Sequence, residues 1–210
     1  MQTAAAAEMR PYHHGDLRKA LLEAGRRLLE VEGNADISLR AVAREAGVSP
    51  AAPYHHFRDK SELLDTLAME GWDQLEAEMR SALAAVGPEG DRLVTMGVAY
   101  VNFARNNPAI YKVMFSCGMG QQSLPESLRD EGAFRLVCET LIQSGSDPTD
   151  QADLELSAVA VWCAAYGVAE LAGFKEFAPL RAHFGGEEPF LRALFSRLDP
   201  FRTKTLSSAG

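Results

Sequence analysis

The 210-residue sequence lacks the features that would place it in a membrane, secreted or disulfide-bonded class. It has no uninterrupted run of about 18 apolar residues, and its start, MQTAAAAEMRPYHH, lacks the charged, apolar and cleavable parts of a signal peptide. It has only three cysteines, Cys117, Cys138 and Cys163, which are widely spaced among apolar neighbours. That pattern favours buried, reduced thiols over a disulfide framework or a zinc site. We therefore expect a cytoplasmic protein.

Positive charge is scarce overall, but it is concentrated at one end of the chain. The formal net charge is −8, with a balance of +1 over residues 1–60 and −9 over residues 61–210. Because an electrostatic footprint depends on the local surface, this leaves the first 60 residues free to bind nucleic acid. Four histidines lie in this part: His13, His14, His55 and His56. Adjacent histidines point apart on a helix, and these have no acidic or cysteine partner at ligand spacing. We therefore predict that they bind no metal or cofactor.

Short helices joined by a glycine turn are predicted near the N-terminus. RKALLEAGRRLLEVEG repeats apolar residues every three or four positions, and Gly33 can end that helix in a left-handed conformation. Ser38 then caps a second, short helix, LRAVAREAG, which Gly47 closes. Ser49 followed by Pro50 reads as the cap and first turn of a third helix. Two short helices joined by a turn of this kind form a helix-turn-helix, whose outer helix enters the major groove of DNA.

The third helix combines small apolar residues with hydrogen-bond donors. Pro50 and Ala51 allow close approach and apolar contact with thymine methyl groups, and the side chains that follow offer donors to phosphates or base edges. Tyr54 is either one of these donors or a core aromatic residue, and Phe57 is expected to face inward. Pro53 removes the first intrahelical hydrogen bond, so this helix is predicted to start late or to be tightly wound.

The run from HGDLRKALLEAGRRLL through ISLRAVAREAGVSPAAPYHHFRDKSELL resembles the DNA-binding domain of the TetR family of bacterial transcriptional regulators. The resemblance covers about residues 12–67 and includes the turn glycine, the VS start, YHHF and K-SELL. It implies that the third helix reads the groove and that a fourth links it to a regulatory domain. Many members have another residue at Pro53. The residues it assigns to DNA are Ser38, Arg40, Ser49, Tyr54, His55 and Lys60 at phosphates and Pro50, Ala51 and His56 near the bases.

The rest of the chain is predicted to be helical. Asp59 with Glu62 three residues later resembles a capping box, which places Lys60 beside a positive helix end, and one long helix extends from there until GPEGD breaks it. No segment alternates as a strand would. We predict an all-α protein with a three-helix DNA-binding domain over 12–60 and a larger regulatory, ligand-binding and dimerisation domain over 61–200.

The second domain is rich in methionine and aromatic residues. Such residues more often build a plain core than a cavity, but three tyrosines among them suit an apolar pocket with a few polar groups. NPAIYKVMF and AVWCAAYGVAELAG are similar to the C-terminal domain of a TetR subgroup named for a Trp…His-Gly signature; here Tyr166 replaces the histidine. The candidate ligand-binding residues are Met96, Tyr100, Phe103, Tyr111, Met114, Phe115, Phe134, Trp162 and Tyr166.

The C-terminal helices are predicted to form a dimer interface. The alanine-rich helix from about 150 to 173 is apolar on more than one face and is expected to be buried on more than one side. Apolar residues also recur at helical spacing in EEPFLRALFSRL, at Phe190, Leu191, Leu194, Phe195 and Leu198. Two such helices from each copy would build a symmetric four-helix interface, and the dimer would read a palindromic site.

The sequence thus predicts a homodimeric regulator of transcription, most simply a repressor, that a small apolar or amphipathic ligand releases from DNA. An enzyme is a second reading, but the second domain has a single histidine, His183, and no nucleophile, phosphate-loop or metal-ligand motif. A third reading is a ligand-binding or interaction protein whose DNA-binding head has degenerated, for which Pro53 is the main argument.

Overall fold

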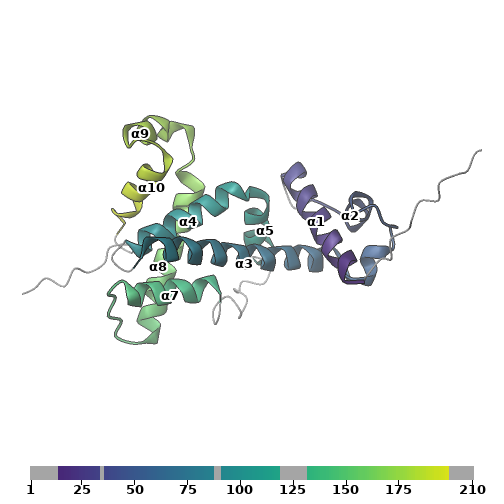
Figure 1. The fold of residues 1–210 in the computed structure, drawn as a ribbon, viewed down its shortest axis with the longest axis horizontal. Coiled ribbons are helices and arrows are strands. Elements are labelled where there is room, and N and C mark those ends of the chain that lie inside the picture. The colour runs from purple at the N-terminus through teal and green to yellow at the C-terminus, as the bar shows by residue number, and fades with distance from the viewer. Residues whose placement is uncertain (1–13, 34–35, 88–90, 119–131, 199–210) are drawn as a thin grey trace, which may run out of the picture.

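The computed structural model describes residues 14–33, 36–87, 91–118 and 132–198, and within these ranges all regular structure is helical, as predicted. One long helix, α3 (Lys60–Val86), runs along the molecule with a small head at its N-terminal end (Figure 1). The head also contains α1 (His14–Glu32), α2 (Leu39–Glu45) and a 3₁₀ turn, η1 (Ala52–His55). The body surrounds the rest of α3 and consists of α4 (Arg92–Asn106), α5 (Pro108–Gly118), α7 (Ala133–Gln143), α8 (Gln151–Leu171), η2 (Lys175–Phe177), α9 (Ala178–His183) and α10 (Glu187–Phe195).

The helix ends in the head follow the sequence signals. Gly33 and Gly47 have φ values of 67° and 69°, in the left-handed region where glycine carries no steric penalty. The Ser38 hydroxyl accepts a hydrogen bond from the backbone N–H of Ala41 at 3.2 Å and so caps α2. Phe57 is 1% exposed, which confirms its inward orientation, and the Arg18 guanidinium lies 5.4 Å from the centre of its ring. Phe57 thus belongs to the hydrophobic core that continues from the head into the body.

The third element differs from the predicted helix. It is only a four-residue 3₁₀ turn, Ala52–His55, with Ala51 at its cap position and no side-chain cap, so the prediction that the Ser49 side chain caps it is wrong. The backbone carbonyl of Ser49 instead accepts from Ala52 N–H at 3.0 Å. Pro53 is buried and lacks the N–H that a longer α-helix would use. The expected late start and tight winding are confirmed, and the element is shorter than expected.

The start of α3 forms a variant of the predicted capping box. Asp59 accepts from the backbone N–H of Glu62 at 3.0 Å, as predicted. The Glu62 carboxylate reaches back to the backbone N–H of Arg58 at 2.8 Å, one residue before the position that a capping box uses. Both contacts fix the point at which the chain leaves the head and enters the long helix.

In the body, α3 packs against α4, α5 and α7, while α8 and α10 cover α4. The closest approach is at Gly71 of α3, where a Cβ atom would lie 2.6 Å from Ile110 Cγ2 and 2.8 Å from Met114 Sδ of α5. The absence of a side chain at Gly71 thus lets α5 lie directly on α3.

The C-terminal helices bury less surface than predicted. Within one chain α8 is covered on one side only, through Leu154, Ala158, Val161, Ala165 and Val168, and its other side is exposed. On α10 the apolar residues Phe190, Leu191 and Phe195 are buried within the chain, because this helix packs on α4. They are therefore not available to a second copy, unlike the outer side of α8.

The cysteines are also less buried than expected. Cys163 is exposed and Cys138 is half-buried, both as free thiols. The side chain of Cys117 lies outside the described residues. The prediction of a buried thiol is wrong for Cys163 in the single chain, because this residue lies on the uncovered side of α8.

Candidate functional site

The nine residues predicted to contact DNA lie at the surface of the head. Tyr54 is 54% exposed, so it is not a core aromatic residue. Lys60 Nζ lies 3.6 Å from Asp36 Oδ1, which brings the start of α3 close to the start of α2. The exposed members are Ser38, Arg40, Ser49, Pro50, Ala51, Tyr54 and His55, and the half-buried ones are His56 and Lys60.

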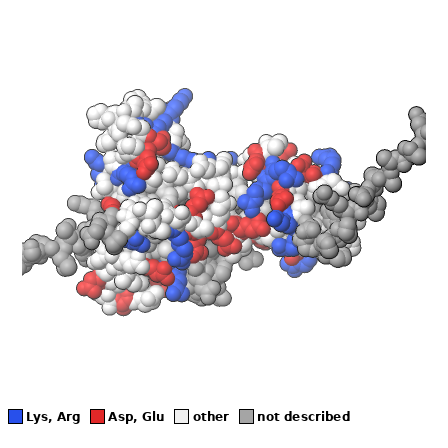
Figure 2. Space-filling view, viewed as in Figure 1, with Lys and Arg blue, Asp and Glu red and all other residues white. Residues whose placement is uncertain are grey.

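A second arginine of α2 adds to this surface. Arg44 follows Arg40 by four residues, so both lie on one side of α2, and both are exposed. Among the residues that the structure describes, no ion pair involves either guanidinium, whereas Arg27 is paired with Glu45 at 2.8 Å. Arg44 was not predicted, although its i, i+4 spacing from Arg40 was the available signal. On the face shown in Figure 2, basic side chains gather at the head and acidic ones along α3 beside it.

Arg58, in contrast, is engaged locally. Its Nε donates to Glu62 Oε2 at 3.0 Å, and its backbone N–H donates to the same oxygen. The backbone and side-chain hydrogen bonds from Arg58 lower the pKa of Glu62, and the hydrogen bond to Glu62 raises the pKa of Arg58. The Arg58 charge is thus already compensated by a neighbour on the same helix start.

The body contains a continuous cluster of aromatic rings between α3, α4, α5, α7 and α8. Tyr111 lies between Tyr100, Phe115 and Tyr166, with ring centres 6.0, 4.9 and 6.3 Å away. Trp162 joins Tyr100 to the rest at 6.0 Å. The structure therefore brings together most of the predicted ligand-binding residues and adds one that was not predicted, Trp72. We call this set the aromatic cluster: Trp72, Tyr100, Tyr111, Phe115, Phe134, Trp162 and Tyr166.

The other three predicted ligand-binding residues lie around this cluster. Met114 packs over Gly71 and Met96 lines a small void, as described below. Phe103 is fully buried in α4. These three side chains therefore form the walls of the core around the rings.

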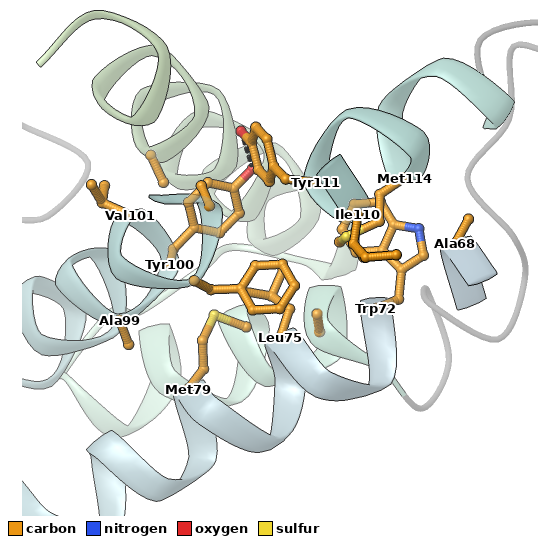
Figure 3. Close-up of a cluster of buried hydrophobic side chains, with 14 of the residues drawn as sticks. Ala68, Trp72, Leu75, Met79, Ala99, Tyr100, Val101, Ile110, Tyr111 and Met114 are labelled. Carbon is orange, nitrogen blue, oxygen red and sulfur yellow. Dashed lines mark hydrogen bonds between the residues drawn. The ribbon is translucent and has the colours of Figure 1, made fainter. Parts of the chain in front are cut away.

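Two tyrosine hydroxyls meet inside the cluster. Figure 3 shows Tyr100 of α4 and Tyr111 of α5 pointing toward each other, with 3.2 Å between their oxygens. Tyr100 is 3% exposed and Tyr111 is 6% exposed. Burial is the main cause that raises the pKa of both hydroxyls, so they are neutral at physiological pH. The pair supplies a polar group within otherwise apolar surroundings.

Among the described residues, the void beside Tyr100 is small. It has a volume of about 10 Å³ and is lined by Met79, Met96, Gly97, Tyr100, Val137, Val161, Trp162 and Ala165. Such a void holds at most about one water molecule, whereas drug-sized ligands occupy pockets of roughly 300–1,000 Å³. A ligand can therefore occupy this void only if some of the side chains that line it move apart.

The outer side of α8 is an apolar stripe. Its exposed or half-exposed members repeat every three or four residues, and we call them the α8 stripe: Leu156, Val159, Cys163, Gly167 and Leu171. Phe174, Phe177 and Leu180 are exposed beyond it. Over its most apolar 18 residues α8 reaches a mean hydropathy of 1.4, enough for a membrane span by length and composition, and only 28% of that stretch is buried. Among the described residues, none covers this surface, and an exposed apolar stripe of this kind is typical of an interaction site.

The described residues offer no group of three or more His, Cys, Asp or Glu side chains that could hold a metal ion. His183, the histidine considered for an enzyme, is exposed and lies edge-on to Phe184 at 5.3 Å between ring centres.

Comparison with known families and structures gives consistent matches over both parts of the chain. Residues 21–67 match the model for bacterial regulatory proteins of the tetR family, and residues 93–197 match that for the tetracyclin repressor-like C-terminal domain. A protein of unknown function from Rhodococcus sp. RHA1 is 30% identical, with a TM-score of 0.67, and the match covers 92% of this chain and 97% of that one.

Two further structures share the fold. A TetR-family transcriptional regulator from Haemophilus influenzae is 19% identical, with a TM-score of 0.61, and the match covers 90% of this chain and 96% of the other. The multidrug binding protein EbrR, solved in complex with imidazole, is 19% identical with a TM-score of 0.58, and the match covers 87% and 89%.

Proposed function

Because the chain belongs to the TetR family of bacterial transcriptional regulators, which are ligand-responsive DNA-binding proteins and not enzymes, we propose that it is a repressor. In this proposal it binds a palindromic operator in the cytoplasm as a homodimer, and a small apolar or amphipathic molecule releases it. The observation that carries the proposal is the exposed loop and turn from Ser49 to His55, held on a buried Phe57 beside the unpaired arginines of α2.

The candidate DNA contacts fall into two groups, one at the base edges and one at the phosphates. Pro50 and Ala51 are small, apolar and exposed, and they suit the base edges, with His56 beside them. Ser38, Arg40, Ser49, Tyr54, His55 and Lys60 suit the phosphates, and Arg44 joins them because it lies one turn from Arg40. Since η1 is so short, few side chains can reach into the groove, and the positioning contacts would supply most of the affinity.

The homodimer would form through the α8 stripe. Regulators of this family act as dimers, and this stripe is the apolar surface of α8 that the chain leaves uncovered. A second copy related by a two-fold axis would cover Leu156 and Val159 with the same residues of its own α8. The predicted contribution of α10 reduces to its outer side, because its apolar residues pack on α4.

Release by a ligand would pass through α5. This helix carries Tyr111 and Phe115 of the aromatic cluster, and between them Lys112 donates to the Gly33 carbonyl at the end of α1 over 3.1 Å. A second tie joins α1 to α3, where Arg26 lies 2.6 Å from Glu70. Rings that move apart to admit a ligand would therefore shift α5 and, with it, the head, which changes the spacing of the two reading elements.

The two-domain division at 12–60 and 61–200 also stays a proposal. The first turns of α3 belong physically to the head, since Leu63 and Leu67 pack against Gly25 of α1. The degenerate-head alternative loses its main argument, because Pro53 sits in a tight turn that needs few N–H donors and is itself buried.

Selection of bound sequences from random duplex DNA tests this function. The purified protein, refolded or dialysed free of small molecules, should enrich a palindrome, and affinity for that palindrome should fall steeply with salt because phosphate contacts release counterions. Absence of enrichment from a folded, ligand-free dimer would overturn the proposal and favour the degenerate-head alternative.

A further inference from the structure

The aromatic cluster carries information about the charge of its ligand. Its seven rings come from five helices, and three of its members, Phe115, Trp162 and Tyr166, are half-buried, so these three are its most accessible rings. The void beside Tyr100 marks where packing is incomplete. Faces of tryptophan, tyrosine and phenylalanine carry partial negative charge, which attracts cations.

The charged group near the cluster is negative, like the faces of the rings. Burial is the largest cause of the raised pKa values of Tyr100 and Tyr111; Tyr166 and the Glu170 carboxylate, one turn beyond Tyr166 in α8, also raise both, and no lysine or arginine contributes. The basic side chains of α4 and α5 make contacts outside the cluster: Arg92 donates to Gln143, Arg105 pairs with Glu187, and Lys112 donates to the Gly33 carbonyl. Glu170 is therefore the charged group that acts on the two buried tyrosines.

The tyrosine pair adds a directional requirement. Two hydroxyls have two protons, and the single hydrogen bond between Tyr100 and Tyr111 uses one of them. No other hydrogen bond from either hydroxyl exists among the described residues, so one O–H has no acceptor, which is costly in a buried site. A ligand with an acceptor or π surface at this point would satisfy it.

We propose that the effector is an aromatic cation, held between the rings of the aromatic cluster with its charge toward Glu170. This inference rests on the proposed function, since it specifies the ligand of that regulator. Entry into the void beside Tyr100 requires side chains of its lining, such as Trp162, to move apart, because the void is far smaller than any such molecule. The cation then replaces contacts between rings with contacts between rings and charge, and the shift of α5 follows.

The chain contains a built-in reporter for the test. Its two tryptophans, Trp72 and Trp162, both belong to the cluster, with ring centres 5.6 Å apart, so the intrinsic tryptophan emission reports on this site alone. Two probes of similar shape and opposite charge are N-methylisoquinolinium and 2-naphthoate, with 2-methylnaphthalene as the neutral member. Binding is measured by calorimetry, and tryptophan emission locates it.

We expect N-methylisoquinolinium to bind at least about tenfold more tightly than 2-naphthoate, the range that cation–π contacts supply in a desolvated site. Glu170→Gln, an exposed isosteric change, should lower that ratio several-fold, while Glu176→Gln in η2, an equally exposed loss of charge, should leave it unchanged. Equal binding of all three probes, or a preference for 2-naphthoate, would overturn the inference. Operator binding is measured without any probe, so it tests the proposed function separately. A protein that binds its palindrome but prefers 2-naphthoate would contradict the proposed ligand class and leave the proposed function intact.

Discussion

Replacing the two buried tyrosines by phenylalanine tests the geometry of the aromatic cluster directly. In Tyr100→Phe the Tyr111 hydroxyl loses its partner, and the reverse holds in Tyr111→Phe. A buried hydroxyl without a partner costs about 1–3 kcal/mol, and each kcal/mol shifts the Tm of a 150–250-residue protein by roughly 2–4 °C. Each single variant should therefore unfold about 2–12 °C lower. The double variant removes both hydroxyls, keeps the ring shapes and should unfold within roughly 1 kcal/mol of the parent.

Thermal unfolding followed by circular dichroism at one fixed protein concentration measures all four proteins, because dimerisation makes the Tm depend on concentration. Tyr54→Phe is the control, since its hydroxyl is exposed and its loss should change stability by less than about 0.5 kcal/mol. The losses of stability in the two single variants should therefore not add up in the double variant. If the double variant loses as much stability as the two single variants together, the hydroxyls do not form the buried pair, and the spare donor inferred from it does not exist.

Three other changes test the head and the dimer. Leu156→Lys should give a monomer in sedimentation, because it places a charge in the α8 stripe, whereas Val31→Lys, at an 81% exposed site on α1, should leave the dimer intact; dimers of equal stability in both variants would contradict the interface. Arg44→Gln should reduce the slope of log affinity against log salt by about one on every DNA sequence, and an unchanged slope would remove Arg44 from the interface. The pKa of Glu62 is lowered in the folded state, so its contribution to stability is present above its ordinary value of 4.5 and is lost as the pH falls below it. Glu62→Gln should therefore lose less stability on acidification from pH 5 to 3, and equal acid sensitivity would contradict this.

The sequence predicted those parts of the fold that depend on local chemistry. Ser38 and Asp59 accept hydrogen bonds at helix starts, and Gly33 closes a helix with positive φ, because caps act within one turn of the chain. Pro53 correctly indicated tight winding, since the missing N–H is also a local property. These signals identified the head and its surface residues without a structure.

Features that depend on long-range packing could not be predicted in the same way. Periodicity shows that α8 has two apolar sides but not that α4 and α7 cover only one, which is why Cys163 was expected to be buried. Trp72 was not predicted to belong to the aromatic cluster, because its partners Phe115 and Trp162 are far away in the sequence. The size of the void likewise depends on side chains from several helices at once.

The central claim is that two copies of this chain together read one DNA site. Sedimentation of the protein with the selected palindrome and with a single half-site, at the same salt concentration, measures both stoichiometry and affinity. The account predicts two protomers on the palindrome and binding at least about 100-fold weaker to the half-site, because each reading element contributes only a few contacts and the dimer joins two sets of them. One protomer on the palindrome, or equal affinity for the half-site, would contradict it.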